Sequence, residues 1–177
     1  MTPPSSKMVP LRCLLFLVAS YFCHLGGTAA GDDKLMTRDS GIWNETSERS
    51  GSVAFTAVKT NNQRLGYKQA VKFEKVLLNE GYGYRAHNGI FCAPRTGVYV
   101  FTSSLLHQGE GITVHFAIVH EGRLMAGFHA NAEWEQFSQT VIIRVRRGET
   151  VSVRNLRGNN PTIYGDEFST FSGYLLK

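Results

Sequence analysis

The sequence predicts an all-β fold, and three observations carry this prediction. Short segments in which apolar and polar residues alternate recur from Gly51 onward. These segments are rich in β-branched and aromatic residues, and turn signals separate them roughly every 8–12 residues. No stretch keeps a helical period, so any helix should be a single turn. Together these features are typical of a β-sandwich or a β-barrel.

Each expected strand can be read from its alternation. The first segment places Val53, Phe55 and Ala57 on one face, and a later one does the same with Val114, Phe116 and Ile118. Such faces should point into a core, because side chains two residues apart lie on the same side of a strand. The main segments are 52–58 (SVAFTAV), 97–106 (GVYVFTSSLL), 112–119 (ITVHFAIV) and 140–153 (TVIIRVRRGETVSV).

The last of these segments resembles a hairpin that turns at Gly148. If Val141, Ile143 and Val145 point inward, the neighbouring arginines point outward, and several guanidinium groups could share one face. Forked donors of this kind suit phosphate, sulfate or carboxylate groups. A solvated face is the alternative. The candidate ligand-binding arginines are Arg144, Arg146, Arg154 and Arg157.

The end of the chain, STFSGYLLK (169–177), is apolar on both faces of the expected strand. A strand of this kind is usually buried on both sides. One face of a sandwich strand meets the core, so the other face is expected to meet another subunit. A glycine within the strand would allow a close approach. The expected subunit contacts are Phe171, Gly173, Tyr174 and Leu176.

The first 30 residues have the features of a secretory signal peptide. Lys7 and Arg12 supply positive charge, an apolar stretch follows from Leu14 to Ala19, and 28–30 (TAA) offers a cleavage site. The apolar stretch is too short for a membrane span, so we expect a secreted extracellular protein without membrane insertion. Residues 31–50 are expected to form a flexible linker, with a glycosylation sequon at Asn44, and residues 51–177 a single globular domain.

The net charge does not indicate a nucleic-acid partner. The whole chain carries +5, and loss of the two basic residues of the signal peptide leaves +3. This excess is modest for a domain of this size.

Enzymatic and metal-site motifs are weak. The sequence has no nucleophile elbow, and neither a CxxC, an HExxH nor an EF-hand loop. We therefore expect a protein that is not an enzyme and requires no cofactor. Calcium binding stays open, with Asp166 and Glu167 as the best acidic candidates. Trp134 in a polar stretch could stack on a sugar or anchor the packing of its loop.

Several pieces of sequence occur in a characteristic order: AFTA (54–57), GIFCAP (89–94), GVYVF (97–101), FSQTVIIRV (137–145) and STFSGYLL (169–176). In this order and spacing they resemble the globular head domain of complement C1q, of the superfamily shared with tumour necrosis factor. The resemblance implies a ten-stranded jelly roll of two five-stranded antiparallel sheets that assembles as a homotrimer. Two positions depart from the family pattern: Glu149 follows the turn glycine, and Arg85 follows Tyr84. No collagen-like repeat precedes the domain, so classical complement activation is not expected.

The resemblance implies a binding role. The leading hypothesis is a secreted pattern-recognition protein that is lectin-like and binds microbial polysaccharide or lipopolysaccharide through a trimeric head. Alternatives are a hormone-like or synapse-organising ligand of a host receptor, and an extracellular structural component.

Overall fold

The computed structural model describes residues 51–109 and 111–177. The predicted signal peptide, linker and Asn44 lie outside these residues. The described part contains twelve strands and no helix. It therefore has no helix that is long and apolar enough to cross a membrane. The all-β prediction is confirmed. The strands are β1 (Ala54–Val58), β2 (Gln63–Arg64), β3 (Lys75–Glu80), β4 (Tyr84–Arg85), β5 (Ile90–Cys92), β6 (Gly97–Gln108), β7 (Val114–His120), β8 (Arg123–Ala130), β9 (Gln136–Val145), β10 (Thr150–Asn155), β11 (Thr162–Ile163) and β12 (Thr170–Leu175).

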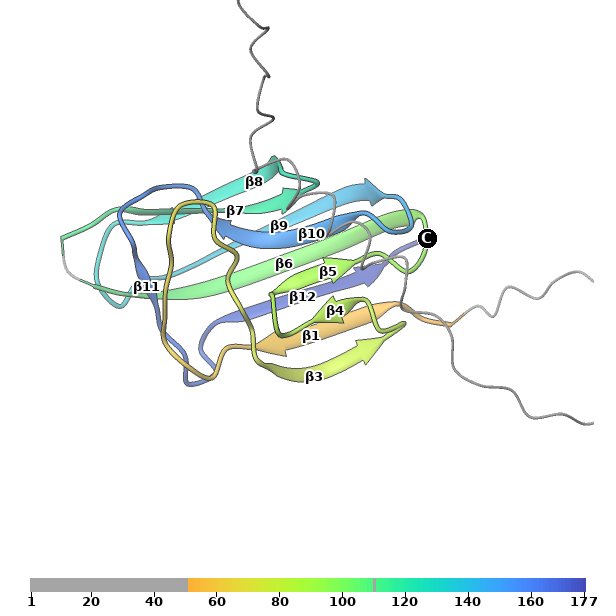
Figure 1. The fold of residues 1–177 in the computed structure, drawn as a ribbon, viewed down its shortest axis with the longest axis horizontal. Coiled ribbons are helices and arrows are strands. Elements are labelled where there is room, and N and C mark those ends of the chain that lie inside the picture. Colours follow the sequence, from red (N-terminus) through yellow and green to blue (C-terminus); the bar gives the residue numbers. More distant parts are fainter. Residues whose placement is uncertain (1–50, 110) are drawn as a thin grey trace, which may run out of the picture. The chain divides into compact units, whose positions relative to one another are not determined.

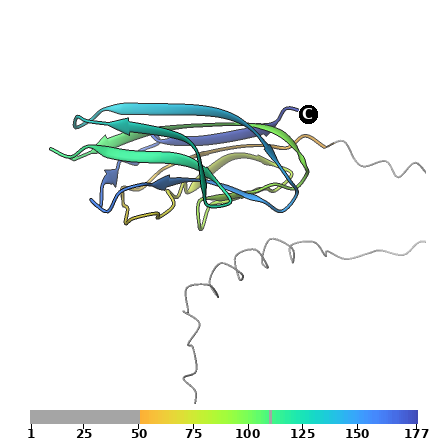
Figure 2. The same cartoon turned by 90° about the horizontal axis from the view of Figure 1, so that it is seen from above.

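Two antiparallel sheets face each other, as Figure 2 shows. One sheet has five strands in the order β4-β5-β10-β7-β8. The other has seven, in the order β2-β11-β6-β12-β1-β3, with β9 also paired to β6. The resemblance implied five strands in each sheet. The larger sheet exceeds this number because β2 and β11, of two residues each, extend it beside the end of β6.

Alternation along the strands fills the space between the sheets with aromatic rings. Phe55 on β1 stacks on Tyr84 at 5.0 Å and on Phe91 at 4.9 Å between ring centroids. Phe101 and Phe171 complete the cluster from β6 and β12, and both are fully buried. Phe55 lies at the inward position predicted from alternation, because successive side chains of a strand point to opposite faces.

The two ends of the sandwich differ in the elements that form them. At the C-terminal end, Val98 near the start of β6 donates its backbone N–H to the carbonyl of Lys177 at 2.8 Å. At the far end, β6 finishes beside β11 and close to the start of β9. Figure 1 shows β11 and the C-terminus at opposite ends of the long strand β6.

The predicted hairpin over residues 140–153 is wrong. β9 pairs with β6 in the seven-stranded sheet, whereas β10 pairs with β5 and β7 in the five-stranded sheet. The connection through Gly148, with φ of 87°, therefore crosses from one sheet to the other. The inward residues were predicted correctly, because Val145 is buried, and Val141 and Ile143 are half-buried and pack against the core. An inward-facing pattern is the same for two paired strands and for two strands in opposite layers.

Candidate functional site

Three aromatic side chains gather at the far end of the sandwich and form what we call the aromatic cluster: Trp134, Tyr164 and Phe168. The rings of Trp134 and Tyr164 meet edge to face, with 5.1 Å between centroids and an interplanar angle of 74°. Phe168 lies 6.0 Å from Tyr164. Trp134 and Phe168 are each 52% exposed, so the cluster presents a large apolar surface to solvent. The sequence left two roles open for Trp134, an anchor for its loop or a surface for a sugar. Trp134 packs on Tyr164 and stays accessible to solvent, so the structure is compatible with both.

The loop between β8 and β9 fixes Trp134 in this position. Trp134 adopts a left-handed backbone conformation, with φ of 59°, and its N–H donates to the carbonyl of His107 at 2.9 Å. The Glu135 carboxylate accepts the N–H groups of Asn131 at 2.8 Å and Ala132 at 3.0 Å, which lowers the pKa of Glu135. A positive φ is uncommon for a residue as bulky as tryptophan. These bonds fix the loop backbone at Trp134, and the contact with Tyr164 orients the indole.

The loop between β11 and β12 supplies the other two rings and both acidic candidates. Asp166 and Glu167 have φ values of 50° and 66°, and their N–H groups donate to the carbonyls of Thr60 and Lys59. Glu167 pairs with Lys75 at 2.5 Å. Of these two carboxylates, Asp166 has no ion pair with another residue that the structure describes. No group of three His, Cys, Asp or Glu side chains in the described residues is arranged to hold a metal ion. Calcium binding at Asp166 and Glu167 stays a prediction from the sequence.

The four candidate arginines do not form one strip. Arg144 lies on β9, where its partner across the sheet is Val98, whereas Arg154 lies on β10 opposite Ala117. These strands belong to different sheets, so the two side chains leave opposite faces of the sandwich. The expectation of a shared outer face fails for the same reason as the hairpin.

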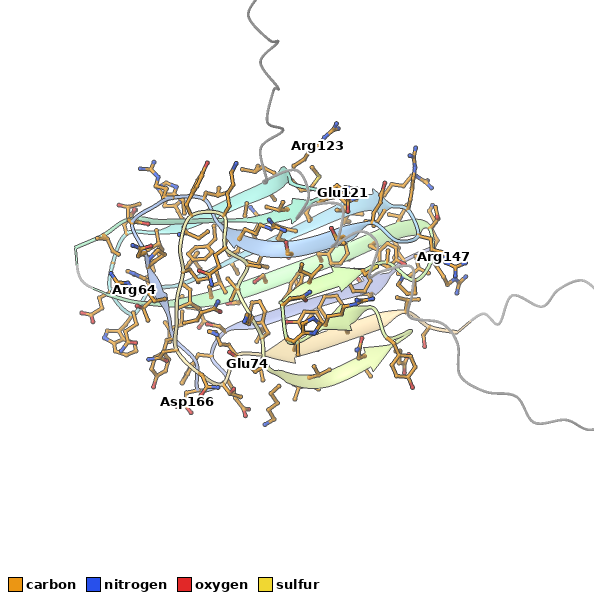
Figure 3. All side chains as sticks on the ribbon, viewed as in Figure 1. Arg64, Glu74, Glu121, Arg123, Arg147 and Asp166 are labelled. Atoms are coloured by element: carbon orange, nitrogen blue, oxygen red, sulfur yellow. The ribbon has the colours of Figure 1, made fainter. Side chains whose placement is uncertain are left out.

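The arginines instead form two separate groups. Arg144, Arg146 and Arg147 lie exposed at the C-terminal end, and Figure 3 shows Arg147 there, opposite Asp166. Arg154 is half-buried and donates its Nε–H to the hydroxyl of Ser152 at 2.9 Å. Burial lowers the pKa of Arg154, and Glu121 opposes this shift. Arg157 follows β10 and is exposed.

The predicted subunit contacts lie on the two faces of β12 and, for Leu176, directly after it. Phe171 is fully buried and Gly173 is buried against Phe101 and Phe55, so both belong to the core of their own protomer. Their assignment to a subunit contact is corrected on this ground. Tyr174 and Leu176 are 49% and 53% exposed, and they remain available to a second copy.

Tyr174 belongs to a row of apolar side chains that the sequence reasoning missed. Val100 on β6 is its partner across the sheet, and Ile142 on β9 is in turn the partner of Val100. Ile142 is 61% exposed. We call these three residues the apolar row; it runs across the outward face of the seven-stranded sheet. The doubly apolar stretch Val141-Ile142-Ile143 could have indicated it, because Ile142 occupies the outward position of its strand.

A model of the C1q domain family matches residues 54–176. This chain belongs to the C1q domain family. The match spans the sandwich from its first strand to its last, so the family resemblance drawn from the sequence is confirmed.

Two curated relatives are similar over the same region. The heavy metal-binding protein HIP of Mytilus edulis is 29% identical over 133 residues, which is 72% of this chain and 62% of the relative. The complement C1q tumor necrosis factor-related protein 3 of Mus musculus is 30% identical over 129 residues, which is 70% of this chain and 50% of the relative. The match therefore spans about half to three-fifths of the length of these relatives.

Solved structures show the same fold. The globular domain of zebrafish complement 1qA has a TM-score of 0.60 at 18% identity, over 71% of this chain and 98% of the other. Murine APRIL has a TM-score of 0.59 at 18% identity, over 72% of this chain and all of the other. Eiger TNF from S. frugiperda has a TM-score of 0.61 at 14% identity, over 72% of this chain and 94% of the other. The jelly-roll prediction is thereby confirmed.

Proposed function

We propose that this protein is a secreted, non-enzymatic recognition protein that assembles as a homotrimer and binds saccharides of microbial surfaces through its aromatic cluster. The observation that carries the proposal is the exposed indole of Trp134, held in a fixed orientation beside Tyr164 and Phe168. An aromatic face offers the apolar side of a pyranose ring a flat partner, and an indole that is already ordered loses little entropy on binding.

The apolar row supports the trimeric part of the proposal. An exposed tyrosine and an exposed isoleucine, aligned through Val100 on one sheet face, form a surface that water solvates poorly. Two further copies would cover such a face in a closed assembly. Three identical saccharide sites would then act together on a repetitive surface, so that weak single sites give strong overall binding.

A glycan array tests the saccharide proposal. The wild-type protein should bind a defined set of microbial saccharides, and Trp134→Ala should lose at least tenfold in affinity while keeping its oligomeric mass. Leu124→Ala is the matched control, because Leu124 is an exposed apolar side chain on β8. Equal binding by wild type and Trp134→Ala would overturn the proposal. If Trp134→Ala dissociates the oligomer, the cluster is a subunit contact.

The second candidate is a trimeric ligand of a host cell-surface receptor, and the likeness to the mouse complement C1q tumor necrosis factor-related protein 3 favours it. Specific capture of one host membrane protein, together with a blank glycan array, would support this candidate. A blank result in both assays would favour an extracellular structural component.

A further inference from the structure

Two histidines lie directly opposite each other on the outward face of the five-stranded sheet. His115 on β7 is the register partner of His129 on β8. Their imidazole rings are 5.7 Å apart between centroids, with an interplanar angle of 20°. The flanking residues Val114, Phe116 and Phe128 are buried in the core, so alternation turns both imidazoles outward.

Neither ring forms a hydrogen bond with another of the described residues, and the two rings stack on each other. His115 is half-buried and His129 is exposed, so a small ion can reach the space between them. Two imidazoles that bind one ion at the usual metal–nitrogen distance of about 2.0–2.1 Å have ring centres roughly 4.5–5.3 Å apart. A small side-chain rotation brings the pair from 5.7 Å into this range.

The electrostatic surroundings favour the form of histidine that binds metals. Partial burial lowers the pKa of His115, and the nearby charges of Arg157 and His129 lower it further. These shifts favour the neutral imidazole, which is the form that binds a metal ion. The carboxylate of Glu135 also interacts with His129 electrostatically and partly offsets the repulsion that Arg157 exerts on a cation.

We propose that His115 and His129 form a two-histidine chelate for a divalent transition-metal ion of the copper, nickel and zinc class. Imidazole nitrogens suit these ions, and a pair of ligands from neighbouring strands is preorganised because the sheet fixes both backbones. Two protein ligands leave the other coordination positions to water or to a group on a bound partner. Copper(II) should bind most tightly of the three, following the general order of affinities for nitrogen ligands.

A substitution of Arg157 distinguishes a cation site from an anion site at the two histidines. If the two histidines and Arg157 served an anion, Arg157→Ser would weaken binding. For a cation site, the same substitution removes a repulsive charge, so copper(II) should bind a few-fold more tightly. The same variant therefore changes affinity in opposite directions under the two interpretations.

The test is titration of the whole secreted protein with copper(II) alone, followed by calorimetry and by electron paramagnetic resonance. Wild type should show nitrogen hyperfine structure from two equivalent imidazoles. His115→Asn and His129→Asn should each weaken binding at least tenfold and leave one imidazole in the spectrum. His87→Asn is the matched control, because His87 is an exposed loop histidine away from the pair, and it should change neither readout.

Two results would overturn the inference. One is an unchanged affinity and spectrum in the double variant His115→Asn/His129→Asn, because the copper would then bind elsewhere. The other is a loss of copper affinity in Arg157→Ser. All these positions lie on the surface of the five-stranded sheet or its loops, so a near-ultraviolet circular dichroism spectrum like that of wild type should confirm that each variant folds. The saccharide proposal is independent, because Trp134→Ala should leave copper binding intact.

Discussion

Gly173 and Phe101 are register partners on β12 and β6, and the Phe101 ring occupies the space where a side chain at Gly173 would point. A Cβ atom at Gly173 would lie 2.6 Å from Cδ1 of Phe101 and 2.7 Å from Cε1 of Phe55. The glycine thus lets the terminal strand close onto two aromatic rings of the core.

Gly173→Ala should destabilise the protein by about 1–3 kcal/mol, because an added methyl group overpacks a rigid core. The midpoint of urea denaturation at fixed protein concentration measures the effect. Gly127→Ala on β8 is the control, since a Cβ there meets only the Phe116 carbonyl at 3.8 Å. A stability of Gly173→Ala equal to that of Gly127→Ala would mean that the terminal strand does not pack as described.

Lys59 is fully buried and its ammonium donates to Glu74 at 2.9 Å, to the Lys72 carbonyl at 2.9 Å and to Gln63 at 3.2 Å. Glu74→Gln should cost on the order of 2 kcal/mol at pH 7, because it leaves a buried charge without its counterion. Lys59→Met should cost less, because Glu74 is partly exposed and water can solvate its carboxylate. Thermal unfolding of the two variants checks the order, and the reverse order would contradict it.

The cost of Glu74→Gln should also depend on pH. Burial lowers the pKa of Lys59, so above neutrality the unfolded chain holds more protons than the folded one. Stability then rises with pH as the pH approaches the unfolded value of about 10.4. The Glu74 carboxylate raises the pKa of Lys59 against the effect of burial, so its loss in Glu74→Gln lowers this pKa further. The stability of Glu74→Gln should then rise with pH more than that of wild type, and the difference between them should shrink between pH 7 and pH 10. A difference that grows over this range would be inconsistent with a charged Lys59 in the core.

The separation of the arginines gives a test by double-mutant cycle. Arg144→Ser, Arg154→Ser and the double variant are compared for binding to a short sulfated oligosaccharide, which cannot span both faces of the sandwich. Any effects should add within about 0.3–0.5 kcal/mol, because the side chains lie on different sheets. A coupling energy above about 1 kcal/mol would restore the single strip that the sequence suggested.

Much of the fold followed from the sequence because alternation reports which residues face inward. Phe55, Phe116 and Val145 were placed correctly for this reason. Alternation does not report which strands pair, since an inward residue meets the same core from either sheet. The predicted hairpin was wrong for this reason, and so was the shared arginine face that was inferred from it.

The sequence did not predict which residues come together at the candidate site. Trp134 was singled out as a candidate, but its partners Tyr164 and Phe168 lie some 30 residues further along in a loop without periodicity. Only the sheet topology brings these loops together. His115 and His129 were likewise invisible as a pair, because their spacing depends on the length of the turn between β7 and β8.

The apolar row predicts the effect of a charge on assembly. Ile142→Asp should shift the protein to monomers while its far-ultraviolet circular dichroism stays that of the folded chain, because Ile142 is exposed in the protomer. Leu124→Asp, at an equally apolar exposed position on the other sheet, should leave the assembly intact. Dissociation by Leu124→Asp alone would place the subunit contact on the five-stranded sheet.

The central claim is that further copies of the chain cover the face that carries Tyr174 and Ile142. Light scattering coupled to size-exclusion chromatography measures it most directly, on the purified wild-type protein at micromolar concentration. The account predicts a single species with three times the mass of the protomer. A stable, folded monomer, with Tyr174 and Ile142 open to water, would contradict it.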